Sequence, residues 1–132
     1  MSEIDATLER FAQVIGSQLE KIQKDFPLTQ HDYRRIALAY IGTQKANQEF
    51  MKDLRSLFDQ YKAAMGSYRS IKKKTKQDIE NVRFIARKVS QYLYHSKQNA
   101  RLVSENRSEY NEIKNTAGQY ETELLKDLMK QG

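Results

Sequence analysis

The sequence predicts an all-α protein: an elongated antiparallel helical bundle or coiled-coil hairpin of three helices, or four if the last helix folds back. Three observations support this prediction. Apolar residues recur at steps of three and four along most of the 132 residues, which is the period of one helix face. One proline and five glycines leave few positions that break a helix. The sequence contains no sustained alternation of β-branched residues, which is the pattern that would indicate a strand.

The first helix is expected over residues 2–26. Its apolar stripe includes Phe11 and stops where Pro27 follows. Proline ends a helix because it lacks a backbone N–H and clashes with the preceding turn. At the other end, Ser2 and Asp5 have the spacing of a weak capping box. The helix is therefore expected to begin at Ser2 and to end before Pro27.

The second helix is expected over residues 30–65. Thr29 precedes it and Asp32 stands three residues later, which is the spacing of a capping box. Gly42 lies inside this helix, where glycine costs about 1 kcal/mol relative to alanine. A kink or short break is therefore expected at Gly42. Gly66 follows the last apolar residue of the stripe and marks the end.

The third helix is expected over residues 76–130, because Thr75 and Asp78 form another capping-box pair. Without a break it would exceed fifty residues and be roughly 80 Å long, at 1.5 Å per residue. The helix over residues 30–65 could cover only about two thirds of that length in an antiparallel hairpin. Near-heptad spacing favours coiled-coil-like packing between the helices.

The remaining third, Ile113–Leu128, would then expose an apolar stripe. Either another chain covers this stripe or the helix folds back on itself. The polar interval over residues 104–109 is the first candidate for a fold-back, which would give a four-helix bundle. Gly118 is the second candidate. In both cases we expect one helical domain spanning residues 1–132.

Composition excludes several classes of protein. The chain has no cysteine, so it has no disulfide, thiolate metal site or cysteine nucleophile. Its N-terminal sequence MSEIDATLER is acidic and lacks the apolar core of a signal peptide. Its longest apolar clusters are too short to span a bilayer. We therefore expect a soluble, cytoplasmic protein.

Catalytic motifs are missing from the sequence. We find no HExxH, glycine-rich phosphate loop, nucleophile elbow or calcium loop. The two histidines are His31 and His95. His31 beside Asp32 could form a base or metal pair, but a solvent-facing residue near a helix start is the favoured interpretation. We expect no enzyme activity, catalytic residue, metal, cofactor or small-molecule substrate.

Positive charge is concentrated in one segment. Residues 67–101 carry ten basic and two acidic side chains, whereas the whole chain has a net charge of +6. On a helical wheel one flank of the third helix carries Lys76, Arg83, Arg87 and Arg101 together with Tyr94, and Lys97 lies between that flank and the core edge. A lysine run precedes them. The candidate binding surface consists of Lys72, Lys73, Lys74, Lys76, Arg83, Arg87, Tyr94, Lys97 and Arg101.

Several partners fit this surface. Arginine pairs bidentately with phosphate or carboxylate, and tyrosine stacks on bases, so nucleic acid and an acidic protein are comparable. The lysine run could also extend toward anionic lipid. Membrane binding ranks below both of these partners and is not expected, because the opposite face of the helix has the character of a protein core rather than of a membrane-interface face. The alternative is a solvated flank, or one paired with acidic residues of a neighbouring helix.

The leading functional expectation is a non-catalytic assembly, adaptor or structural subunit that acts through protein–protein contacts, as a homo-oligomer or with another protein. Eight tyrosines support it, because tyrosine is common at interfaces. The alternative is a nucleic-acid-binding subunit that uses residues 72–101. The candidate assembly interface consists of Phe84, Ile113, Tyr120, Leu124 and Leu128.

Overall fold

The computed structural model describes residues 3–22 and 28–131, and every regular element in them is a helix. The prediction of an all-α protein is confirmed. The described residues form six helices in place of the expected three or four. They are α1 (Glu3–Ile22), α2 (Gln30–Ile41), α3 (Gln44–Arg69), α4 (Lys76–Ser96), α5 (Ala100–Glu105) and α6 (Arg107–Gln131). The expected start at Ser2 and stop at Pro27 lie outside the described residues.

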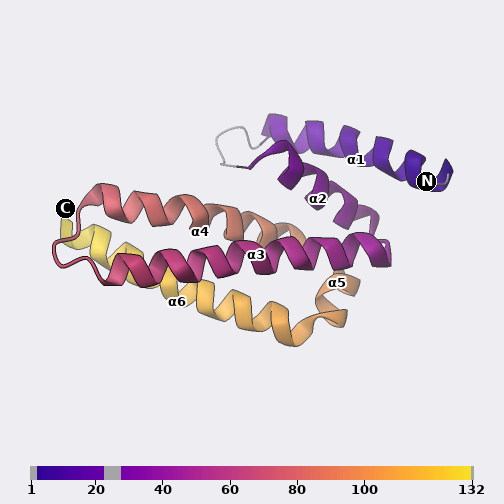
Figure 1. Ribbon diagram of the computed structural model, residues 1–132. Helices are drawn as coiled ribbons and strands as arrows, with labels where there is room; N and C mark the ends of the chain where they lie inside the picture. The colour runs from indigo at the N-terminus through magenta and orange to yellow at the C-terminus, as the bar shows by residue number, and fades with distance from the viewer. Residues whose placement is uncertain (1–2, 23–27, 132) are drawn as a thin grey trace.

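Helices α3, α4 and α6 form a three-helix bundle (Figure 1). The connection over residues 70–75 reverses the chain between α3 and α4. Helix α6 then returns along α4, so that Gln131 Nε2 donates to the Lys74 carbonyl at 2.8 Å. At the other end α2 packs on α3 and α4, and α1 packs on the outside of α2. None of the helices in the described ranges is long and apolar enough to cross a membrane.

The expected second helix is divided at Gly42. This glycine has φ of 80°, a left-handed conformation that glycine adopts without steric cost. Its N–H donates to the Leu38 carbonyl at 3.2 Å and closes α2. Thr43 then starts α3 by accepting from the Ala46 N–H at 3.1 Å. The structure therefore has a full break where the sequence indicated a kink or short break.

The expected third helix is divided twice, so a continuous helix over residues 76–130 is wrong. One break lies at Asn106, inside the predicted interval 104–109, and it allows α6 to fold back. The other lies at residues 97–99 and was not predicted. Gly118, the second candidate for a break, lies within α6.

Asn99 stabilises the unpredicted break. Its Oδ1 caps α5 by accepting from the Leu102 N–H at 3.0 Å. Its Nδ2 donates to the Ala39 carbonyl at 2.6 Å and to Asn47 Oδ1 at 2.9 Å. One side chain therefore satisfies polar groups at the ends of three helices, which offsets the helical hydrogen bonds lost at the break.

The core lies between α3, α4 and α6 and continues under α2. Its largest fully buried side chains are Tyr61, Tyr68, Tyr92, Phe50, Phe58, Ile36, Leu54, Met65, Ile79, Leu102, Ile113 and Leu124. Helix α1 differs from its predicted pattern, because Ala12 is buried while Phe11 is exposed. Since α1 packs mainly on α2, a small residue at the contact allows the two backbones to approach closely.

Candidate functional site

The lysine run lies in the connection between α3 and α4. Thr75 Oγ1 accepts from the Asp78 N–H at 3.2 Å, and the Asp78 carboxylate accepts from the Thr75 N–H at 2.9 Å. This capping box begins α4 where the sequence predicted it. Lys72 and Lys73 are exposed. Lys74 is partly engaged, because its Nζ donates to the Ile71 carbonyl at 2.8 Å.

Two arginines of the predicted basic stripe are already paired. Arg83 and Arg87 both donate to the Glu80 carboxylate, at 2.8 and 2.9 Å. Burial alone would raise the pKa of Glu80, but the hydrogen bonds from the two guanidinium groups outweigh it and lower the pKa. The Glu80 carboxylate thus compensates part of the positive charge that we expected to be available to a partner.

Arg101 is removed from the stripe by the break at residues 97–99. It lies on α5 and pairs with Glu105 at 2.8 Å. The helical wheel placed it in line with Arg83 and Arg87 only because it assumed one continuous helix. The predicted stripe of α4 therefore ends with Tyr94 and Lys97, and its arginines are held by acidic neighbours.

Tyr94 remains accessible. Its side chain is 55% exposed, and its ring stands edge-on to His95, with centroids 5.1 Å apart. On the other side of His95, the Tyr40 hydroxyl is hydrogen-bonded to His95 Nδ1 at 2.8 Å. Burial lowers the pKa of His95. A buried histidine thus fixes two partly exposed tyrosines, one from α2 and one from α4. Lys76 and Lys97 are also exposed and form no ion pair with any residue in the described ranges.

Phe84 lies on the side of α4 away from the buried residues and is exposed. Its side chain is 49% exposed, and Lys88 Nζ lies 5.5 Å from the centroid of its ring. A cation over the ring face is weakly favourable. We define the outer face of α4 by Phe84, Lys88 and Tyr94, together with the neighbouring Tyr40.

The other four residues of the predicted assembly interface lie in the core of the single chain or pack against it. Ile113 and Leu124 are fully buried in the core of the single chain. Tyr120 and Leu128 are partly buried and pack against this core; the Tyr120 ring stands edge-on to Tyr61 at 5.1 Å. The stripe over Ile113–Leu128 needs no second chain, because the fold-back of α6 covers it.

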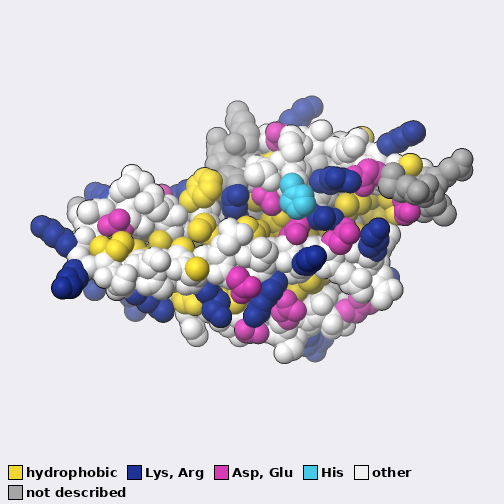
Figure 2. Space-filling model, in the orientation of Figure 1, with side chains coloured by type: hydrophobic (Ala, Val, Ile, Leu, Met, Phe, Trp, Pro, Cys, Tyr) yellow, Lys and Arg dark blue, Asp and Glu magenta, His cyan; other side chains and the backbone are white. Residues whose placement is uncertain are grey.

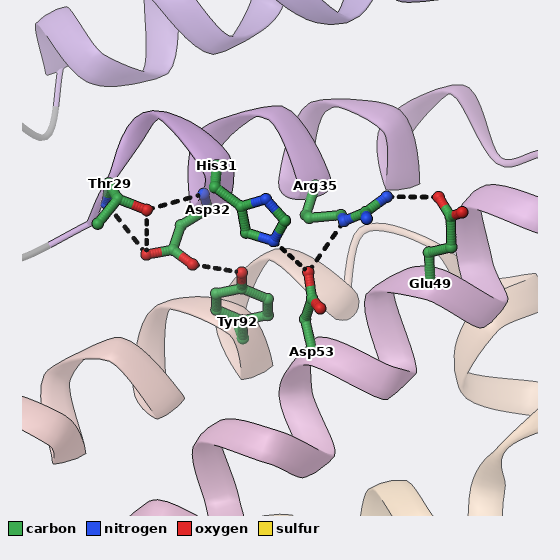
Figure 3. Close-up of polar contacts among 7 residues, drawn as sticks. All are labelled: Thr29, His31, Asp32, Arg35, Glu49, Asp53 and Tyr92. Carbon is green, nitrogen blue, oxygen red and sulfur yellow. Dashed lines mark hydrogen bonds and ion pairs between the residues drawn. The ribbon is translucent and has the colours of Figure 1, made fainter.

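A polar network that the sequence did not predict joins α2 to α3 and α4 (Figure 3). Asp32 is buried, and its Oδ1 accepts from the Tyr92 hydroxyl at 2.7 Å. Its Oδ2 accepts from the Thr29 N–H and hydroxyl, both at 3.0 Å. Burial, and then the hydrogen bond to Asp32, raises the pKa of Tyr92. The Thr29–Asp32 spacing was visible in the sequence, whereas the partner sixty residues away was not.

The second half of the network lies nearer the surface. Asp53 forms an ion pair with Arg35, whose Nε lies 3.0 Å from Asp53 Oδ2, and the same oxygen is hydrogen-bonded to His31 Nε2 at 3.0 Å. Arg35 also pairs with Glu49, so all these contacts connect α2 to α3. A cavity of about 200 Å³ beside them is lined by His31, Asp32, Asp53, Ser56, Leu57, Gln60 and Tyr92. Because both carboxylates already accept from fixed donors, the arrangement holds helices together.

Two kinds of surface thus remain for a partner: the aromatic outer face of α4 and the exposed lysines. The polar network connects helices, and both Asp32 and Asp53 already have polar partners within it. No family model, curated protein or solved structure matches the chain.

Proposed function

We propose that this protein is a non-catalytic helical adaptor that binds a partner protein through the outer face of α4. One observation supports this most directly. Phe84 and Tyr94 are 49% and 55% exposed on a helix whose opposite face is buried in the core. Aromatic residues are enriched at protein interfaces and contribute a large share of the binding energy.

The charges around these rings indicate the chemistry of the partner. Lys88 and Lys97 form no ion pair with any acid in the described ranges, whereas Arg87 is held by Glu80. An acidic rim on the partner would complement the two lysines, and an apolar centre would cover the rings. This complementarity favours a partner helix or loop with aliphatic residues flanked by Asp or Glu.

The complete core of the monomer supports an adaptor over an obligate coiled coil. Ile113 and Leu124 are covered within the chain, so no apolar stripe of α6 requires another copy. The exposed rings of Phe84 and Tyr94 are ten residues apart on α4, and polar side chains such as Lys88 and Ser90 lie between them in the sequence. Such a surface fits a partner that binds and dissociates.

Site-specific photo-crosslinking tests the proposal. A photoreactive amino acid replaces Phe84 or Tyr94, and Lys62 or Gln119 in matched controls, which are exposed positions on α3 and α6. In cells that express the protein at its natural level, positions 84 and 94 should give one common product, and the controls none. Equal products from all four positions would refute the proposal, as would no product from positions 84 and 94. A product of twice the chain mass would identify self-association instead.

The second candidate is nucleic-acid binding, which the exposed Tyr94 and Lys97 favour. Stacking of a base on the tyrosine and contact of the lysine with phosphate would be the expected contacts. The double change Tyr94→Ala, Lys97→Gln should then weaken binding, and loss of the lysine should reduce its salt dependence. If the double variant binds oligonucleotides as the unchanged protein does, this candidate is refuted.

A further inference from the structure

Arginine and lysine differ in how their charges are compensated. Seven of the nine arginines form ion pairs within 4.0 Å. None of the lysines in the described ranges does so. Within the described ranges, most of the positive charge that no ion pair compensates is therefore carried by lysine, with Arg10 and Arg107 as the unpaired arginines. A docking surface should be sought where lysines gather.

Six lysines gather at one end of the bundle. Both the α3–α4 connection and the last turns of α6 lie there (Figure 1), where basic side chains protrude from the surface (Figure 2). The Tyr68 hydroxyl fixes the two segments to each other by donating to Asp127 Oδ2 at 2.6 Å. We define the lysine end by Lys72, Lys73, Lys74, Lys76, Lys126 and Lys130.

The acidic residues of this end are already engaged. Asp78 caps α4, Asp127 accepts from Tyr68, and Glu123 pairs with Arg69 through two hydrogen bonds of 3.0 and 2.7 Å. Residues 69–78 and 123–131 together contain seven basic and three acidic side chains. These residues therefore keep a net charge of +4, seven basic against three acidic side chains, and none of the three carboxylates forms an ion pair with a lysine of this end.

Exposed aliphatic side chains accompany the lysines. Met129 is 80% and Leu125 is 41% exposed, one helical turn apart on α6. The features of a nucleic-acid surface are weaker here. Tyr68 is buried and offers no ring for stacking. Residues 69–78 and 123–131 contain one arginine, Arg69. Its guanidinium group already donates two hydrogen bonds to Glu123.

We propose that the lysine end docks end-on against an anionic lipid surface. A plane can meet the connection and the end of α6 together, because both end at the same level of the bundle. Each lysine near an anionic membrane strengthens binding about fivefold. The aliphatic side chains of Met129 and Leu125 can enter the headgroup layer between the ammonium groups. No helix needs to lie flat, so the core-facing side of α4 stays covered.

Vesicle sedimentation tests this surface. The protein is mixed with phosphatidylcholine vesicles that contain or lack phosphatidylserine. The variant of the lysine end, called the tip variant, carries Lys72→Gln, Lys73→Gln and Lys130→Gln. The control variant carries Lys45→Gln, Lys52→Gln and Lys114→Gln, three exposed lysines of α3 and α6. Both variants lose three charges and keep the core, and their melting curves verify folding.

The expected result is binding to phosphatidylserine vesicles that falls about 100-fold in the tip variant and much less in the control. Met129→Ser should weaken the binding that persists at high salt. Equal losses in both triple variants would overturn the proposal, since charge would then act without a defined surface. So would tighter binding to a duplex DNA or RNA oligomer than to vesicles. A Phe84→Asp, Tyr94→Asp variant should retain lipid binding, which separates this surface from the outer face of α4.

Discussion

The hydrogen bond between Tyr92 and Asp32 should be measurable as a loss of stability in Tyr92→Phe. The substitution removes one oxygen and preserves the packed ring. Asp32 Oδ1 then loses the 2.7 Å bond while remaining buried. A hydrogen bond to a charged group contributes about 1.5–3 kcal/mol, so the free energy of unfolding should fall by about that amount.

The same chain provides two matched controls. Tyr61 and Tyr110 are buried, and their hydroxyls have no hydrogen-bond partner among the described residues. Tyr61→Phe and Tyr110→Phe remove the same atom without breaking a hydrogen bond. They also remove a buried hydroxyl whose desolvation no hydrogen bond offsets. Both should be neutral or slightly stabilising.

Thermal unfolding followed by circular dichroism compares the three variants. With an unfolding entropy of about 2.1 cal/mol/K per residue, a loss of about 1.5–3 kcal/mol corresponds to a fall in Tm of roughly 5–11 °C for a chain of this length. The controls should stay within about 2 °C of the unchanged protein, on the same conversion. A Tyr92→Phe variant as stable as Tyr61→Phe would refute the view that this network holds α2 on the bundle.

Three further predictions concern the core, the buried histidine and the paired arginines. In denaturant unfolding, Leu124→Ala should lower the free energy of unfolding by about 2–5 kcal/mol. The exposed Leu125→Ala should lower it by about 0.5 kcal/mol or less. Equal losses would contradict the packing of Leu124 in the core. Burial lowers the pKa of His95 below the ordinary histidine value of 6.5. Stability should therefore fall as pH drops below that unfolded value, since the unfolded chain then binds the proton more readily; this slope should flatten in His95→Gln. Glu80→Gln releases the two arginines of α4 and should raise the salt concentration needed to elute the protein from heparin, while the free energy of unfolding changes by less than about 1 kcal/mol. Unchanged elution would mean that these arginines are not held by Glu80 in solution.

Features that depend on neighbours in the sequence were predicted well. The starts of α2 and α4 follow from Thr29 and Thr75, because a capping box involves residues only three positions apart. The break at Gly42 likewise depends on the conformation of one residue. The periodicity of apolar residues was sufficient for the fold class.

Features that depend on distant partners were not predicted. The break at residues 97–99 contains no proline or glycine, and Asn99 stabilises it through Ala39 and Asn47, more than fifty positions away. The wheel placed Arg87 on an open flank, yet its guanidinium reaches Glu80 two turns back. Sequence spacing locates a side chain on a face but does not determine which neighbour its charged end contacts.

The packing of α2 also predicts the order in which the helices assemble during folding. Helices α3 and α4 are joined by the short connection of residues 70–75, so their pairing closes a small loop at low entropic cost. The bonds from Asp32 to Tyr92 and from Asn99 to Ala39 each close a loop of sixty residues, and they can form only after α4 exists. The α3–α4 hairpin should therefore form before α2 docks on α4. In amide exchange, α1 should open without the rest of the molecule.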